Sequence, residues 1–590
     1  MSAPASRAGA WPIIRAYWVS PDSGPGWRLL AAVIALDLAL VWRAARITYW
    51  QKDFYDTLQK MDEAAFWPLL AMLVLLALTG LVLSTARTWL AQSLEMRWRA
   101  WMTDVYLKRW LAGSAFWRLE REQHLAGSSV ENVDQRLAED LRMLASDTLS
   151  LSLGLLSNFV SLFTFSAIVW SMSGVLSITL GGASFEVPGY MLWVALIYAA
   201  GGSWLMEKIG GRMVAIDYRQ QQAEADFRTA LMRIRESAEQ IALYGGGHAE
   251  HARLTALFDA VKHNWRDIMV YTKRITITDN AYTEAGALVP YVLQGPRVLK
   301  GIITMGDLIQ LTQSFMRVRV ALSWFIYKYK SLALLRSALA RLAEFDAALQ
   351  AASGATASAP RITRQRGPAA SGYALQGVQA LGPGGRPLTP VVNWRIAPGE
   401  RWMLRGPSGA GKSTLLRALA GLWTHGHGHI ATPPETAEAP ETAETPKTAT
   451  APGAAAAPRA ETLFVPQQSY LPAGTLRACL AYPALETAFS DDDCQAALRW
   501  ACLPALTHRL HESAHWARQL SPGEQQRLAF ARIWLHRPRW LFLDEATSAL
   551  DEETEERLYT RLTRDLPGLT LVSIAHRSSL RRFHEHEMQL

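Results

Sequence analysis

The sequence predicts a membrane domain of six transmembrane α-helices fused to an α/β P-loop NTPase domain. One observation is the stretch 406–414, Gly-Pro-Ser-Gly-Ala-Gly-Lys-Ser-Thr, which fits the phosphate-binding pattern G-x-x-x-x-G-K-[ST] between an apolar run and a helix-forming run. The other is composition. Half of the 590 residues are hydrophobic and only 19% are charged, against about 25% in soluble domains. The deficit of charge is concentrated in the N-terminal half.

Six apolar segments are candidates for the membrane spans. They are residues 27–49, 66–88, 149–172, 187–206, 278–303 and 308–335. Each exceeds or approaches the ~20 residues that a helix needs to cross the hydrocarbon core. The last two carry several charged residues, which indicates that they line a polar cavity.

Composition also predicts the domain boundaries. We assign residues 1–350 to the transmembrane domain, 351–370 to a linker rich in Ala, Ser, Gly and Pro, and 371–590 to the ATP-binding domain. Residues 431–460 interrupt this last domain with a tract of Ala, Pro, Thr and Glu that cannot form a core. We expect a disordered surface insertion there.

Basic residues predict how the chain lies in the membrane. The long segments after the second and fourth spans are rich in Arg and Lys, whereas residues 173–185 contain neither. Both long segments and the ATP-binding domain are therefore expected in the cytoplasm. The net charge of +8 reflects this orientation in a lipid bilayer, and no nucleic-acid partner is expected. The first 26 residues lack the apolar core of a cleavable signal peptide, and the three cysteines suit neither a disulfide framework nor a zinc site.

The phosphate loop and a later strand together predict ATP and Mg²⁺ as ligands. The loop residues expected around the phosphates are Gly406, Pro407, Ser408, Gly409, Ala410, Gly411, Lys412, Ser413 and Thr414. Residues 540–545 are an apolar strand that ends in two carboxylates. Asp544 and Ser413 are placed to hold Mg²⁺, and Lys412 to reach the β and γ phosphates. Glu545 is the candidate general base for the attacking water.

Residues 520–527, Leu-Ser-Pro-Gly-Glu-Gln-Gln-Arg, open a predicted helix. Here the chain resembles the ATP-binding cassette (ABC) superfamily, whose signature sequence it matches with Pro522 in place of the commoner Gly. A serine at a helix start offers its hydroxyl and nearby amides to a phosphate. The resemblance implies that this helix faces the γ-phosphate of ATP held by a second subunit. The contacting residues would be Ser521, Gly523, Glu524 and Gln525.

Three further residues match motifs of the same family. Gln467 resembles the glutamine that senses Mg²⁺ and contacts the membrane domain, and so joins the implied catalytic and metal-binding residues. Asp551 resembles the aspartate at the dimer seam, and His576 the switch histidine that contacts the γ-phosphate. The aromatic residue that usually stacks on adenine is absent near position 382, so Tyr373 or Trp394 is left as a substitute.

Residues 132–140 and 239–246 narrow the family further. They look like markers of the group that contains the peroxisomal fatty-acyl, bacterial BacA/SbmA-like and mycobacterial vitamin B12 transporters, and they should rest on the ATPase domains. The resemblance implies a half-transporter with the ABC exporter type of fold, working as a homodimer in the bacterial inner membrane. The transported small molecule or peptide would belong to one of three classes: peptides, cobalamin-like molecules, or fatty-acyl and other amphipathic molecules. A lipid or drug exporter, and an ATP-driven sensor or regulator without transport, are the alternatives.

Charged residues within the spans offer one clue to the solute. Four arginines occur at comparable depth in the first and sixth spans, namely Arg43, Arg46, Arg317 and Arg319. Charges at such depth usually face a cavity or pair with one another. Either they give a cavity positive character that admits an anionic or amphipathic solute, or they pair with Asp37, Glu284 or lipid headgroups.

Overall fold

The computed structural model describes residues 10–126, 132–180, 183–351, 360–367, 372–382, 385–433, 461–575 and 577–590. The chain divides into two compact units. One comprises Met1–Ala112 and Ser129–Leu349, and the other comprises Gly113–Ser128 and Gln350–Leu590.

The first unit is helical, and six long helices dominate its described part. They are α2 (Gly24–Lys60), α3 (Glu63–Leu111), α6 (Leu141–Ser173), α7 (Tyr190–Glu236), α9 (Gly247–Leu299) and α10 (Met305–Gln350). Each expected span lies in one of these helices, apart from a few terminal residues, so the six-helix prediction is confirmed. Within the described residues, two stretches of helix are apolar enough by length and composition to cross a membrane, Glu63–Arg121 and Val133–Ser173.

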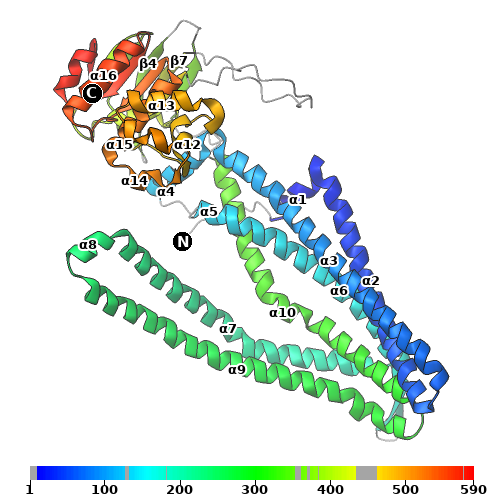
Figure 1. Cartoon of the computed structure of the whole chain (residues 1–590). Helices are drawn as coiled ribbons and strands as arrows, with labels where there is room; N and C mark the ends of the chain where they lie inside the picture. Colours follow the sequence, from blue (N-terminus) through cyan, green and yellow to red (C-terminus); the bar gives the residue numbers. More distant parts are fainter. Residues whose placement is uncertain are drawn as a thin grey trace, which may run out of the picture. The chain divides into compact units, whose positions relative to one another are not determined.

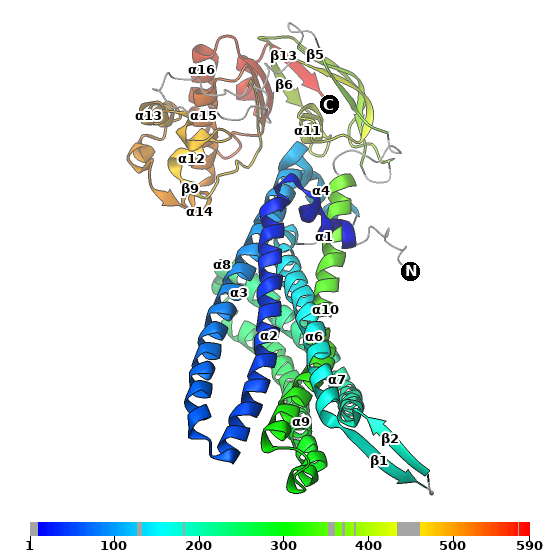
Figure 2. The ribbon, with the colours of Figure 1, turned by 90° about the vertical axis from the view of Figure 1, so that its right-hand side faces the viewer.

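Short elements join or precede these helices. They are α1 (Ala10–Val19), α5 (Val133–Gln135) with a π-helical turn (Arg136–Asp140), α8 (Ala238–Leu243), and an antiparallel hairpin of β1 (Val175–Leu180) and β2 (Ala183–Pro188). In Figure 1, α7 and α9 run side by side and α8 connects them at one end. In Figure 2, the hairpin projects from the end where α6 passes into α7.

Apolar residues at helical spacing hold this unit together. Phe165 and Val169 of α6, Met191 of α7, and Phe315 and Val318 of α10 lie in one buried cluster. The turn between α2 and α3 is built differently, because Met61 takes a left-handed conformation and the Asp62 side chain caps α3 by accepting the N–H of Ala65.

The second unit contains a five-stranded parallel sheet in the order β13-β6-β12-β11-β8. These strands are β6 (Arg401–Arg405), β8 (Thr462–Val465), β11 (Trp540–Asp544), β12 (Thr570–Ile574) and β13 (His586–Gln589). Strands β11 and β12 are almost wholly buried, as expected for central strands covered on both faces. The predicted α/β class is confirmed.

A four-stranded sheet and two groups of helices complete this unit. The sheet has the order β3-β7-β4-β5, with β3 (Thr363–Arg366), β4 (Tyr373–Ala380), β5 (Val392–Ile396) and β7 (Gly426–Thr432). The helices are α4 (Ala115–Ala126), α11 (Lys412–Leu419), α12 (Leu476–Ala481), α13 (Asp491–Trp500), α14 (Trp516–Gln519), α15 (Pro522–His536) and α16 (Glu552–Asp565). A short pair, β9 (Gly474–Thr475) and β10 (Ser513–Ala514), lies within the helical part.

Two of the predicted segments, the linker and the insertion, can be compared with the structure only in part. The proposed linker, 351–370, contributes strand β3, which pairs in parallel with β7. Most of the proposed insertion, residues 434–460, lies outside the described residues.

Candidate nucleotide-binding and hydrolysis site

The phosphate loop connects strand β6 to helix α11. Gly406, Gly409 and Gly411 have φ angles of 153°, 84° and 90°, which residues with a Cβ rarely adopt. A Cβ at Gly411 would collide with the backbone oxygen of Leu388. The loop therefore needs glycine at this position, and its backbone turns into α11 in the way that a phosphate-binding loop requires.

The side chains at the start of α11 point back to the loop and across to β11. The buried ammonium of Lys412 donates to the carbonyl oxygens of Gly406 at 2.8 Å and Pro407 at 3.0 Å. The Ser413 hydroxyl donates to Asp544 Oδ1 at 2.9 Å. The Lys412 ammonium is thus held against the phosphate loop. The Ser413 hydroxyl and the Asp544 carboxylate, which lie in contact, are hard oxygen ligands of the kind that Mg²⁺ takes. These residues fit the nucleotide and the metal that the motif implies.

The two catalytic candidates near Asp544 also meet. Gln467 Nε2 donates to Glu545 Oε2 at 3.1 Å, although the residues are 78 positions apart. Glu545 has a φ angle of 47°, a left-handed conformation that is uncommon for a residue other than glycine. Its N–H donates to the Ile574 carbonyl of β12 at 3.1 Å. Backbone strain of this kind persists where the surroundings fix it, and it is common at functional sites.

The Asp544 carboxyl sits in an unusual electrostatic setting. Burial raises its pKa, the hydrogen bond from Ser413 lowers it, and the neighbouring Glu545 raises it again. Lys412 and Arg417 oppose the increase. A partly buried carboxylate between a cation and a second carboxylate gains most from a ligand that brings positive charge.

The signature helix α15 begins with a capping box. Ser521 Oγ accepts the Glu524 N–H at 3.3 Å, and Glu524 Oε2 accepts the Ser521 N–H at 2.9 Å. The hydrogen bonds that the Glu524 carboxylate accepts from the N–H and the hydroxyl of Ser521 lower its pKa. Pro522 occupies the first helical position, which tolerates proline. Gln525 donates to the carbonyl oxygens of Ala517 and Leu520, both at 2.9 Å, so its amide supports the turn before the helix.

Asp551 and His576 complete the predicted set. The Asp551 side chain caps α16 by accepting the Thr554 N–H at 2.9 Å, and this hydrogen bond lowers its pKa. His576 lies outside the described residues. Next to it in the sequence, Arg577 Nη1 donates at 3.1 Å to the buried carboxylate of Glu555 on α16.

The two aromatic residues considered for adenine stacking are buried in the core instead. Only 3% of Tyr373 and 5% of Trp394 is exposed. The Tyr373 ring packs edge-on against Trp540 and Phe542, and Trp394 packs against Trp402. Neither has a free face for adenine, so the expectation that one of them substitutes is wrong. Their alternation along β4 and β5 already indicates an inward-facing core position.

Helix α4 belongs to the same compact unit as the ATPase sheets. Trp117 packs against the core that surrounds α11, and the Arg121 guanidinium carbon lies 3.3 Å from the ring centroid of Trp423. Trp423 follows α11 by four residues and donates to the carbonyl oxygens of Leu381 and His425. The basic segment after the second expected span is therefore anchored beside the phosphate-loop helix.

The two marker segments, 132–140 and 239–246, have different surroundings. In the first, Asp140 is buried and accepts Arg341 Nε of α10 at 2.9 Å, within the helical unit. In the second, Leu243 and Tyr244 at the end of α8 are 80% and 89% exposed. Sequence reasoning gave these segments the role of resting on the ATPase domain. It missed α4, whose Trp and Arg content does not by itself distinguish a docked helix from a solvent-exposed one.

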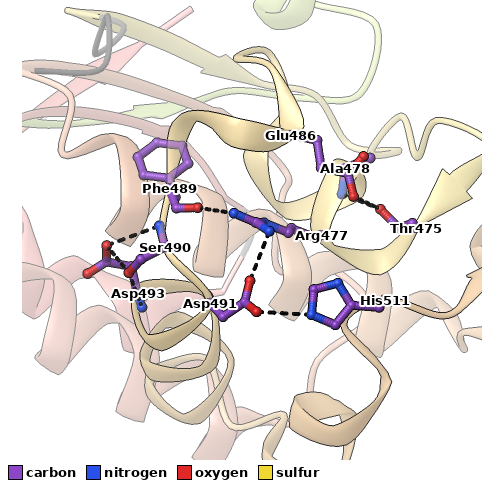
Figure 3. A network of polar contacts seen from close by, with 9 residues as sticks. All are labelled: Thr475, Arg477, Ala478, Glu486, Phe489, Ser490, Asp491, Asp493 and His511. Carbon is purple, nitrogen blue, oxygen red and sulfur yellow. Dashed lines mark hydrogen bonds and ion pairs between the residues drawn. The ribbon is translucent and has the colours of Figure 1, made fainter. Parts of the chain in front are cut away.

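A polar network braces the segment that follows Gln467 (Figure 3). Arg477 of α12 forms an ion pair with Asp491 Oδ1 at 3.0 Å and donates to the Phe489 carbonyl at 2.6 Å. His511 Nε2 lies 3.0 Å from the other Asp491 oxygen. The start of α13 is thereby tied to α12 and to the loop that leads toward the signature helix.

Comparisons with known proteins agree with this geometry. A family model described as "ABC transporter transmembrane region 2" matches residues 13–299, and one described as "ABC transporter" matches residues 390–548. The "Inner membrane ABC transporter ATP-binding protein YddA" of Escherichia coli K12 is 31% identical over 570 residues, covering 96% of this chain and 94% of that protein. The chain is an ABC half-transporter. Its ATPase activity is coupled to transport across a membrane.

Further relatives of this half-transporter carry different names. The Arabidopsis thaliana "ABC transporter D family member 2, chloroplastic" is 29% identical, with 97% of this chain and 84% of that protein covered. The human "Lysosomal cobalamin transporter ABCD4" is 25% identical, with 96% and 92% covered. A solved bacterial Atm1-family ABC exporter with ATP bound matches with a TM-score of 0.65 and 18% identity over 95% of this chain and 93% of that one. This last likeness confirms the exporter fold.

Proposed function

We propose that the half-transporter works as a homodimer in the bacterial cytoplasmic membrane, with its ATPase domain in the cytoplasm. The convergence of Ser413 with Asp544 and of Gln467 with Glu545 supports ATP hydrolysis, and the exposed start of the signature helix carries the proposal of a dimer. The exposed Ser521 and its capping box would face the γ-phosphate held by a second copy, with Asp551 at the seam. Closed two-fold dimers are the commonest oligomers. The relative from E. coli is named as an inner membrane protein, which supports the location.

The residues of the site divide the hydrolysis between them. Lys412 would exchange its two loop carbonyls for the β and γ phosphates of ATP. Ser413, Asp544 and Gln467 would hold Mg²⁺, which supplies positive charge against the phosphate oxygens when bound. Glu545, oriented by the Gln467 amide, would accept the proton of the attacking water. His576 would contact the γ-phosphate.

We propose that the transported molecule is amphipathic and anionic. Asp37, considered as a partner for the intramembrane arginines, instead binds Arg87, with Arg87 Nε donating to Oδ1 at 3.0 Å. The Arg43 Nε donates to the Leu76 carbonyl at 2.5 Å. Arg43 and Arg46 line a cavity of about 470 Å³ between α2 and α3 whose other residues are almost all apolar. Such a lining suits an anionic head joined to an apolar body.

The sixth helix adds two more cations of the same kind. The guanidinium of Arg317 lies 5.9 Å from the ring centroid of Phe165. Arg319 is 6% exposed, lies 5.1 Å from the ring centroid of Tyr282 and donates to Thr283 Oγ1 at 3.3 Å. Within the described residues these contacts are to neutral groups, so they leave both charges uncompensated. Arg317 is exposed to a solute, whereas Arg319 is buried.

Uptake or release by reconstituted vesicles tests this proposal. Arg317→Ala and Arg319→Ala should lower the preference for an anionic over a cationic amphiphile by about tenfold each, because each removes about one charge-assisted contact. Lys300→Ala, an exposed residue just after α9, is the matched control and should change nothing. An unchanged preference in both arginine variants would remove the anionic substrate from the proposal. Peptides and cobalamin belong in the same panel.

A further inference from the structure

Gln526 is a buried polar residue of the signature helix that the sequence motifs did not single out. Only 6% of its surface is exposed. Both ends of its amide are engaged by the turn after β11: Nε2 donates to Ser548 Oγ at 3.1 Å, and Oε1 accepts the Ala549 N–H at 2.9 Å. A buried amide with both groups satisfied fixes the geometry of the segments it joins.

Two neighbouring contacts continue this link at each end. On the helix side, the ideal Cβ position of Gly523 lies 3.2 Å from the Ala549 carbonyl oxygen, so the turn approaches the helix start closely. On the strand side, the Ser548 N–H donates to the Glu545 carbonyl at 3.1 Å. Gln526 is thus linked through Ser548 to the backbone of the candidate base Glu545. In the sequence it follows Gly523 of the signature motif by three positions.

We propose that Gln526 is a positioning residue that couples the two ATP sites of the dimer. The inference rests on the proposed function, in which Ser521 and Glu545 of one chain serve different nucleotides. A displacement of the signature helix when it closes on the partner's ATP would pass through the Gln526 amide to Ser548 and then to Glu545. The base of one site is then set in place by closure of the other, which makes hydrolysis cooperative.

The test uses the full-length half-transporter in nanodiscs. Gln526→Met keeps the length of the side chain and removes both hydrogen bonds. Gln526→Glu keeps an acceptor for the Ala549 N–H and for the Ser548 hydroxyl. Gln495→Met is the matched control, since Gln495 contacts Arg499 on the surface of α13. The readouts are the ATP dependence of phosphate release, the affinity for a fluorescent ATP analogue and the thermal midpoint.

We expect wild type to show a Hill coefficient well above 1 and below the limit of about 2 set by two sites. Gln526→Met should bring this coefficient to about 1 and lower kcat about tenfold, the loss that one buried hydrogen-bonded link accounts for. The affinity for the first nucleotide should stay within about twofold, because the phosphate loop is untouched. Gln526→Glu should restore most of the cooperativity, and Gln495→Met should behave as wild type.

Three results overturn the inference. Cooperative wild type with an unchanged Gln526→Met variant removes the coupling role and leaves the homodimer proposal standing. If the thermal midpoint, the nucleotide affinity and kcat all fell together in both Gln526 variants, the residue would have only a structural role. A non-cooperative wild type removes the coupling role, and only a monomeric wild type in the nanodiscs contradicts the homodimer proposal itself.

Discussion

The contact between Arg121 and Trp423 predicts how the ATPase domain passes its movement to the membrane helices. Arg121 lies on α4, which the chain joins directly to α3, while Trp423 follows the phosphate-loop helix α11. The guanidinium carbon lies 3.3 Å from the ring centroid of Trp423 and 5.5 Å from that of Trp117. Arg121→Ala removes both contacts and the packing of the side-chain stem.

The expected loss follows from this geometry. A cation held over a buried tryptophan contributes about 1–2 kcal/mol, which corresponds to about 5- to 30-fold in the coupling between nucleotide closure and helix movement. Arg121→Ala should therefore lower substrate-stimulated ATPase activity and transport by about that factor. Basal nucleotide affinity should remain unchanged, because Lys412 and Ser413 keep their contacts. Arg121→Lys should give an intermediate value, since lysine retains the charge and loses the planar stacking.

The assay compares basal and stimulated ATPase activity with transport in the same vesicles. Glu120→Ala, an exposed neighbour on the same helix, is the control and should match wild type. If Arg121→Ala transported at the wild-type rate, or lost basal nucleotide binding in equal measure, the assignment of the coupling contact would be incorrect.

Three further predictions concern the ATPase domain. Gly411→Ala should abolish ATP binding in a fluorescent-analogue titration, because a Cβ meets the Leu388 carbonyl and the φ of 90° is unfavourable; retained binding would show that the loop relaxes. Glu545→Gln should lower phosphate release by about 10²-fold or more while nucleotide remains trapped, and near-normal turnover would disprove its role as base. Burial lowers the pKa of His536, whose Nε2 lies 2.9 Å from the Ala481 carbonyl, so the fold favours the neutral ring. That stability is present above the unfolded pKa of about 6.5 and is lost as the pH falls toward the folded value. The thermal midpoint should fall between about pH 7.5 and about pH 5.5, and fall less in His536→Gln; an equal fall in both would rule out His536 as the cause.

Local sequence predicts those features of this chain that depend on neighbouring residues. The phosphate loop, the strand ending in Asp544 and the capped helix after Ser521 each have their signal within about ten residues, because turn conformation and helix capping are local. Long apolar runs likewise predict six helices, since a membrane helix satisfies its backbone within one segment.

Features that depend on packing between distant segments could not be predicted in this way. The Asp37–Arg87 pair joins residues 50 positions apart, and Gln526 reaches a turn 22 positions away. Tyr373 was a candidate for adenine stacking because its burial could not be predicted from the sequence. That burial depends on how the two sheets bring Tyr373 against Trp540 and Phe542. The docking of α4 was missed for the same reason, since an Arg-rich and Trp-containing helix is equally consistent with a solvent-exposed one.

ATP-driven movement of a labelled amphiphile into proteoliposomes distinguishes a transporter of anionic amphiphiles from an ATPase that moves no solute. Wild type and Glu545→Gln would be compared with a panel of fatty acyl-CoA, lipids, cobalamin, and anionic and cationic peptides. We predict that an anionic amphiphile stimulates ATP hydrolysis by the wild-type protein and is moved by it. The Glu545→Gln variant should move nothing. If no member of the panel stimulated hydrolysis and none was moved, the result would contradict transport of an anionic amphiphile. It would favour a regulatory ATPase.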